Sequence, residues 1–334
     1  MIKLFSLLLV LAVLLSCQSN RLKVDVSSID LTLKLSRLDH ELFAVNSQNI
    51  ASQLPKIQKS YGQFFEAYNE NVLGLGNSTD PAYENYLKTF LSDSIRQASV
   101  KQIDSVYSDL TELKQQLELG FKHYKYYFPN KTIPTIITLV SGFNQSIVLT
   151  SDAIGLSLDN YLGSSCTFYK QLGIPAYKRE NMVREKIPAD IIYAWGISEF
   201  GFDESKVNLI SQMIYQGKMM FFVDAMLPDE ADNYKIGYTP DKLAWCVQHE
   251  ASMWTYLIEH KMLFSSDRMN IVRFINPAPF TSCFTADSPG RTGVWMGWQI
   301  VRAYMKKHPE ISIPELMAEN DYQKILNESG YSPE

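Results

Sequence analysis

The chemistry that this sequence suggests first is metal binding by a helix. Residues 245–261, WCVQHEASMWTYLIEHK, place the pair His249-Glu250 and a further His260 in a run with helical periodicity. A zinc peptidase helix needs two histidines four residues apart, because one turn then brings both imidazoles to the same face beside the catalytic glutamate. The residue four positions after His249 is Met253, and His260 lies about 16 Å further along the axis. We therefore predict no metal site and no other cofactor.

Nucleophilic catalysis has one candidate pair, on the same helix. Cys246 and His249 are three residues apart, so they could face each other within one turn. A dyad within one turn of a helix is an unusual construction, and the sequence contains no GxSxG pattern. A buried cysteine beside a partly buried histidine is the favoured interpretation. The sequence therefore predicts a protein without catalytic residues.

Other charged residues add no catalytic or nucleic-acid chemistry. The acidic stretch from Asp224 to Asp232 lacks the alternating spacing of a calcium loop, so we predict a solvated turn there. The formal net charge is −5, and lysine and arginine do not gather into runs that would neutralise phosphates. Nucleic acid is therefore not expected as a partner.

The first twenty residues, MIKLFSLLLVLAVLLSCQSN, are typical of a bacterial lipoprotein signal. Lys3 precedes an apolar run that is too short to span a hydrocarbon core of about 30 Å as a permanent helix. The run ends in Leu14-Leu15-Ser16-Cys17, which resembles the lipobox that is cleaved before a lipidated cysteine. We predict a signal peptide over 1–16, lipidation of Cys17, a tether over 17–28 and a mature protein anchored to a membrane and facing the periplasm. The sequence does not distinguish the inner from the outer membrane.

Cleavage would leave Cys166, Cys246 and Cys283 in an oxidising compartment. An odd number of thiols allows at most one disulfide, and no pair has the CxxC spacing of a redox or zinc motif. The pairing among these three cysteines stays open.

The elements that must position these residues are mostly helices. Of the 334 residues, 46% are hydrophobic, which is ample for one large core. Residues 29–35 alternate like a strand, and helical periodicity then dominates up to about residue 128. Three short aliphatic runs, at 136–140, 147–149 and 153–159, predict a small antiparallel sheet. Helical patterns return at 188–201, 207–227, 239–263 and 290–309. We predict an α+β fold, with residues 29–334 forming a single domain whose N-terminal part is helical.

Three stretches combine Trp, Gly and Pro at specific spacings. They are MIYQGKMMFFVDAMLPD (213–229), IGYTPDKLAWCVQHEASMW (236–254) and SPGRTGVWMGWQIVRAYM (288–305). With the lipobox, they resemble the gliding motility lipoproteins of the GldB family of Bacteroidota over nearly the whole chain. The resemblance implies a noncatalytic, lipid-anchored envelope component of the gliding machinery. It also implies partners among the envelope proteins of gliding and type IX secretion.

A more distant resemblance is to a family of predicted zinc peptidases. Their metal-binding helix would correspond to residues 190–200, DIIYAWGISEF, which contain no histidine, and their Glu-Gly pair to Gln216-Gly217. The resemblance thus implies a degenerate zincin-like core whose metal ligands are lost. Such a core could keep a groove beside the 136–159 sheet, walled by the helices of Trp195 and Gln216, that binds a partner segment by strand addition. Arg291, at the start of the 290–309 helix, is the charged residue that we rank first there, because the helix dipole disfavours a cation at that end. A carboxylate partner that only neutralises it is an equally open alternative.

Two other function classes remain open. One is a zinc metallopeptidase-like hydrolase with ligands outside the usual motif, which a metal analysis of the purified protein would reveal. The other is a glycan-binding or solute-binding lipoprotein, suggested by the many tryptophans, some of which could line a groove.

Overall fold

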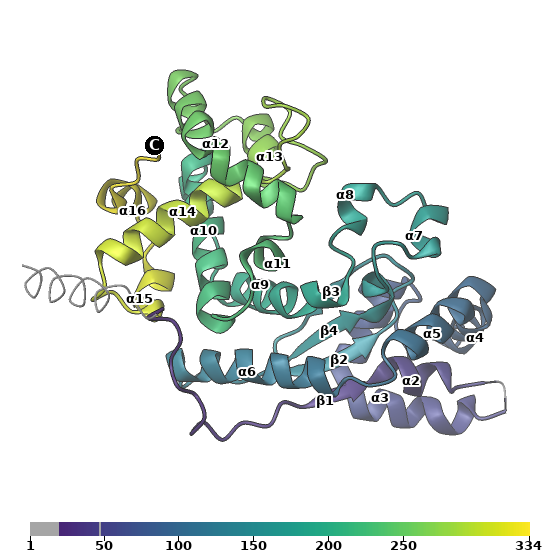
Figure 1. Cartoon of the computed structure of the whole chain (residues 1–334). Coiled ribbons are helices and arrows are strands. Elements are labelled where there is room, and N and C mark those ends of the chain that lie inside the picture. Colours follow the sequence, from purple (N-terminus) through teal and green to yellow (C-terminus); the bar gives the residue numbers. More distant parts are fainter. Residues whose placement is uncertain (1–19, 47) are drawn as a thin grey trace, which may run out of the picture.

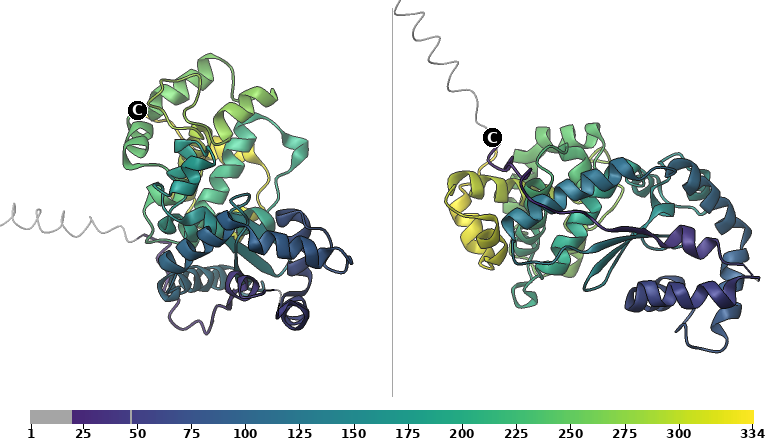
Figure 2. Two further views of the ribbon diagram at one scale, coloured as in Figure 1. Left: turned by 90° about the vertical axis from the view of Figure 1, so that its right-hand side faces the viewer. Right: turned by 90° about the horizontal axis from the view of Figure 1, so that it is seen from below.

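The computed structural model describes residues 20–46 and 48–334 (Figure 1). Cys17 and the expected signal peptide lie outside the described residues. The α+β class is confirmed, because helices surround one small four-stranded sheet. Figure 2 shows helices α2 to α5 at one end of the molecule and α14 to α16 at the other.

The sheet is mixed, which corrects the prediction of a purely antiparallel one. Its order is β1 (Leu35–Arg37), β2 (Thr135–Leu139), β4 (Ala153–Ser157) and β3 (Ile147–Leu149). The pairs β1–β2 and β2–β4 are parallel, and only the β3–β4 hairpin is antiparallel. A long helical segment connects β1 to β2 and returns the chain to the same end of the sheet, as a parallel pair requires. The strand expected from residue 29 begins only at Leu35.

The helical character predicted up to residue 128 is observed. The elements of this part are α2 (Leu38–Phe43), α3 (Ile50–Ala67), the π-helical η1 (Tyr68–Leu73), α4 (Tyr83–Ser92), α5 (Ser94–Val106) and α6 (Thr111–Tyr127). Alternating side chains of β2 enter two hydrophobic clusters. Ile137 and Leu139 join the cluster of α3 and η1, whereas Ile136 joins the larger cluster that includes α6. Because successive side chains of a strand point to opposite faces, β2 packs against the N-terminal helices on one face and against the rest of the molecule on the other.

The second half of the chain is a larger helical assembly. Its elements are η2 (Leu158–Tyr161), α7 (Thr167–Gln171), α8 (Ala176–Arg179), η3 (Arg184–Lys186), α9 (Ile187–Glu199), η4 (Glu204–Lys206), α10 (Leu209–Met226), α11 (Asp232–Ile236), α12 (Pro240–Glu259), α13 (Arg268–Ile275), α14 (Thr292–Lys307), α15 (Ile313–Ala318) and α16 (Tyr322–Ser329). Helix α10 is buried along nearly its whole length, because its apolar residues go round the axis instead of forming one stripe.

Helices α10 and α14 cross at backbone contact. A Cβ added to Gly297 would overlap the carbonyl of Met213, and one added to Gly217 would overlap the carbonyl of Gly297. Side chains normally keep packed helix axes 8–10 Å apart, so only glycine permits so close an approach. The glycines in the QGK and MGW stretches therefore fix where α14 lies on α10 (Figure 1).

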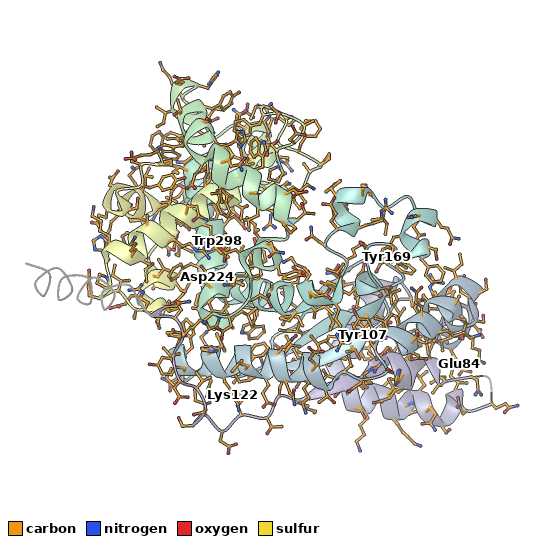
Figure 3. The ribbon with its side chains drawn as sticks, viewed as in Figure 1. Glu84, Tyr107, Lys122, Tyr169, Asp224 and Trp298 are labelled. Carbon is orange, nitrogen blue, oxygen red and sulfur yellow. The ribbon has the colours of Figure 1, made fainter. Side chains whose placement is uncertain are left out.

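A buried ion cluster joins the same two helices beyond the crossing. The Asp224 carboxylate accepts hydrogen bonds from Trp298 Nε1 at 2.8 Å, from Arg302 at 2.8 and 2.9 Å and from Lys235 Nζ at 2.9 Å (Figure 3). Burial alone would lower the pKa of Arg302, but the hydrogen bonds that it donates to Asp232 and Asp224 raise it well above its usual value. The prediction of a solvated acidic turn is therefore wrong for Asp224, which is buried because three cationic or polar donors compensate its charge.

The described part of the expected tether lies against the protein. Leu22 and Val26 are buried, and Arg21 Nη1 donates a hydrogen bond to the Pro309 carbonyl at 3.1 Å. The N-terminal segment is thus held beside the end of α14. The three cysteines that follow the lipobox are all free.

Substituting Gly297 by alanine tests the helix crossing. The added methyl group has no space, so α14 must move away from α10, and we expect a loss of about 3 kcal/mol in the free energy of unfolding. Urea denaturation measures it. Gly201→Ala is the matched control, because an added Cβ there meets nothing within 4 Å. Equal stability of the two variants would contradict the crossing.

Candidate functional site

A cavity of about 580 Å³ lies at the carboxyl ends of the parallel strands. The loops that follow β2 and β4 form one wall, and α8 and the start of α12 face each other across it (Figure 1). The loop 277–291, which leads into α14, closes a further side. Ligands of sheets with parallel strands commonly bind at this edge, and the volume is in the usual range for ligand sites.

The loop after β2 is held in place by a buried carboxylate. Gly142 and Phe143 both have positive φ, at 72° and 65°, and the N–H groups of Ser141 and Phe143 converge on Asp159 at 3.1 and 2.6 Å. Burial raises the pKa of Asp159 to about 6, although the two N–H groups oppose the rise. The hydroxyl of Tyr169, labelled in Figure 3, donates to the Asp159 carbonyl at 2.8 Å. Asp159 therefore shapes the loop whose residues Phe143, Asn144 and Ser146 line the cavity.

The polar wall of the cavity centres on Asp190, in the first turn of α9. The Asp190 carboxylate accepts a hydrogen bond from Tyr161 at 2.9 Å and pairs with Lys186 Nζ at 2.7 Å. Burial and the charge of Asp190 raise the pKa of Tyr161 well above its usual value, so this hydroxyl stays a neutral donor. Lys186 also donates to the Lys235 carbonyl at 3.1 Å. Asp190 is thus compensated within the wall itself.

Arg291 comes from the loop that leads into α14 and lines the same cavity. Its backbone is left-handed, with φ 61°, at the residue before α14. Its Nη1 donates to the Ile236 carbonyl at 2.8 Å, and its guanidinium carbon lies 5.8 Å from the centre of the Tyr193 ring. At the rim, Lys242 pairs with Glu180 at 2.6 Å. The cavity therefore combines cationic groups with apolar and neutral polar side chains.

Of the three residues predicted to form the groove, the structure places only Arg291 in the cavity. Trp195 is buried on another face of α9, with its ring 6.5 Å from that of Tyr124. Gln216 accepts a hydrogen bond from the Tyr193 hydroxyl, so Tyr193 connects Gln216 to Arg291. Helix α9 contributes Asp190 to the cavity, whereas α10 contributes none of the residues that line it. The part of these three residues in binding stays a prediction.

The cavity residues around Asp190 were not predicted from the sequence. Asn160, Tyr161 and the loop residue Asn144 follow directly after strands β4 and β2. The rule that sites gather at the carboxyl ends of parallel strands would have indicated them, but an antiparallel sheet gave no reason to apply it.

His249 lies on α12 and His260 directly follows this helix, and neither residue lines the cavity. The ring of His249 stacks on Trp245 at 4.2 Å, and its Nδ1 lies 2.8 Å from the Trp245 carbonyl. His260 Nδ1 likewise lies 2.9 Å from the carbonyl four residues before it, that of Tyr256. Cys246 is buried, and burial raises its pKa well above that of a free thiol. Over the described residues, no group of three or more His, Cys, Asp or Glu side chains is arranged to hold a metal ion.

Fold and cavity together define an α+β protein with a ligand-sized cavity at the edge of a small mixed sheet. A family model described as gliding motility protein GldB matches residues 19–333, which is nearly the whole chain. The protein therefore belongs to the GldB family of gliding motility proteins.

Two further comparisons found no match. Neither a curated protein nor a solved structure matches the chain. The zincin-like core consequently stays a prediction. No helix within residues 20–46 and 48–334 combines the length and the apolar character needed to cross a membrane.

The raised pKa of Asp159 predicts a pH dependence of stability. The folded protein holds this proton up to about pH 6, whereas an unfolded aspartic acid loses it near pH 4. Asp159 therefore contributes stability that is fully present below pH 4 and is lost as the pH rises through 6. The difference is about 3 kcal/mol.

Urea unfolding of the wild type and of Asp159→Asn between pH 4.5 and 7.5 tests this contribution. The stability of the wild type should fall relative to that of the variant as the pH rises. Asp30→Asn is the control, since Asp30 is exposed and its carboxylate remains solvated. Parallel stability curves for the wild type and Asp159→Asn would contradict the assignment.

Proposed function

We propose that the protein is a noncatalytic, lipid-anchored component of the gliding machinery in the cell envelope, and that its cavity binds a segment of a partner protein. The family assignment supports the part in gliding and agrees with a place in the cell envelope. The observation that carries the binding role is the cavity at the carboxyl ends of β2 and β4, lined by both apolar and charged side chains.

The charges in the cavity favour binding over catalysis. Asp190 is paired with Lys186 and hydrogen-bonded by Tyr161, and Glu180 is paired with Lys242. A general base must have a lone pair free to accept a proton from the substrate, whereas these carboxylates already face donors within the wall. These side chains therefore suit the recognition of a ligand.

The sheet edge favours an extended protein segment as the ligand. Strand β3 is at the edge of the sheet, and Asn144 and Ser146, which precede it, line the cavity. Peptides commonly add to such an edge through main-chain hydrogen bonds, with side chains entering adjacent pockets. Partners among the envelope proteins of gliding and type IX secretion remain part of the proposal.

Lipid attachment at Cys17 would place the anchor close to the folded part of the protein. Asn20 is the first described residue, and three residues span at most about 11 Å. Because Arg21 is hydrogen-bonded to the Pro309 carbonyl, the lipid would attach beside the end of α14.

The anchor is tested by Cys17→Ala. This variant should incorporate no radioactive palmitate in cells and should leave the membrane fraction, because no other acyl attachment point is proposed. Cys283→Ala should keep both the label and the membrane association. A Cys17→Ala protein that still carries the label would refute the anchor.

The binding role of the cavity is tested by Asn144→Trp. Asn144 is exposed and lines the cavity, so a tryptophan there obstructs the space without disturbing the core. We expect cells with this variant to lose most of their spreading on agar while the amount of protein stays normal. Asn85→Trp, on an exposed face of α4 outside the cavity, should spread like the wild type. Normal spreading of both variants would count against the cavity as a functional site.

The size of the cavity also favours a second candidate, a lipoprotein that binds a glycan or another solute. About 580 Å³ suits a small ligand, and Phe143 and Tyr177 offer aromatic surfaces. A thermal-shift screen with saccharides and peptides separates the two candidates. Near-stoichiometric zinc in the purified protein would instead favour the metallopeptidase-like alternative.

A further inference from the structure

The cavity carries more positive than negative charge, although the protein as a whole is acidic. Four cationic and two acidic side chains line it, whereas the chain has a net charge of −5. Both acidic groups are neutralised in place, because Asp190 pairs with Lys186 and Glu180 with Lys242. Among the described residues, no carboxylate lies within 4.0 Å of the remaining cations, Arg291 and Lys178. The cavity thus has two cationic charges without an internal partner.

The position of Arg291 is fixed by its backbone. The Pro289 carbonyl accepts hydrogen bonds from the N–H and hydroxyl of Thr281 at 3.0 and 2.8 Å, and the Gly290 carbonyl accepts one from Tyr238 at 2.8 Å. A left-handed conformation is costly for a residue with a long side chain, and such strain persists only where the surroundings enforce it. The loop therefore presents the guanidinium in one defined place, which lowers the entropic cost of binding.

The guanidinium keeps donors for a ligand. Its Nη1 donates to the Ile236 carbonyl and the Tyr193 hydroxyl is a second neutral partner, but the described residues provide no carboxylate for this guanidinium. The planar fork of an arginine that no internal carboxylate occupies matches the two oxygens of one carboxylate. Apolar side chains of Ile174 and Met182 line the same space. The cavity therefore offers a carboxylate clamp beside an apolar surface.

We propose that the cavity recognises a carboxylate next to an apolar side chain in a partner segment, and that Arg291 is the group that binds it. This inference rests on the proposed function and specifies the chemistry of its ligand. The carboxylate can come from the end of a chain or from an acidic side chain, because both present the same pair of oxygens. Lys178, which is exposed at the rim, attracts the ligand without fixing its orientation.

Protection of Arg291 from phenylglyoxal tests the proposal on the full-length lipoprotein in detergent. The reagent modifies accessible guanidinium groups, and mass spectrometry of peptides follows each arginine separately. N-acetyl-leucine represents a chain end, N-acetyl-glutamic acid α-amide an acidic side chain, and N-acetyl-leucinamide a ligand without a carboxylate. A carboxylate at about twice its dissociation constant should slow modification of Arg291 about threefold. Arg268, exposed at the first residue of α13, should react at a constant rate and is the internal control.

The comparison between the two carboxylates identifies the source, since only the preferred one should protect at low concentration. Equal modification of Arg291 with the carboxylates and with N-acetyl-leucinamide would overturn the proposal. An Arg291 that the reagent cannot modify would overturn it as well, because a binding group must be accessible.

Arg291→Asn provides an independent measurement. Asparagine tolerates the left-handed backbone, so the variant removes the guanidinium and relieves the strain together. In a thermal-shift titration with the protecting carboxylate, the wild type should be stabilised and Arg291→Asn should not, while Arg268→Asn should behave like the wild type. A stabilisation that Arg291→Asn retains would overturn the proposal. If the carboxylates neither protect Arg291 nor stabilise the protein while Asn144→Trp reduces spreading, the carboxylate inference fails and the proposed function stands. If the carboxylates bind through Arg291 while Asn144→Trp spreads normally, the cavity binds a ligand but the proposed function fails.

Discussion

The close approach of α10 and α14 is the constraint on which the rest of the structure depends. Two glycines, Gly217 and Gly297, let the helix backbones touch where any side chain would overlap a carbonyl group. Because helix packing normally tolerates sliding by a fraction of a turn, a backbone contact of this kind sets the position of α14 with little freedom. The positions of both ends of α14 are then defined: one end lies at the cavity and the other beside the N-terminal segment.

At one end, α14 begins in the cavity. Arg291 precedes its first turn, lines the cavity, and contacts Tyr193 of α9 and the Ile236 carbonyl. The other wall depends on the sheet, since the loop after β2 takes its shape from the N–H groups that Asp159 binds. The cavity is therefore assembled from two parts of the fold, a helix located by glycine contacts and a loop located by a buried carboxylate.

The elements that local patterns determine were predicted well, and those that depend on distant partners were not. Helical periodicity placed α10, α12 and α14 to within a few residues, because amphipathic and apolar patterns act over single turns. The parallel pairing of β1 with β2 could not be derived, since about a hundred residues separate the strands. Asp224 was assigned to a solvated turn because its partner Arg302 is 78 residues away.

The same division holds for the candidate site. Arg291 was found because a cation at a helix start is locally unfavourable and calls for an explanation. Trp195 and Gln216 came from a distant resemblance, and they lie behind the cavity wall instead of in it. Asp190 pairs with Lys186 only four residues before it, but its place in the cavity arises when the fold brings Tyr161 against it from 29 residues away.

The length of α14 has a mechanical consequence. Its 16 residues extend about 24 Å from Arg291 towards Pro309, where the N-terminal segment is bonded. A pull on Arg291 would travel along one rigid rod, braced midway by α10 and the Asp224 cluster, to the N-terminal segment that Arg21 holds at Pro309. The sheet would share this load only through the loops that follow β2 and β4, which form another wall of the cavity.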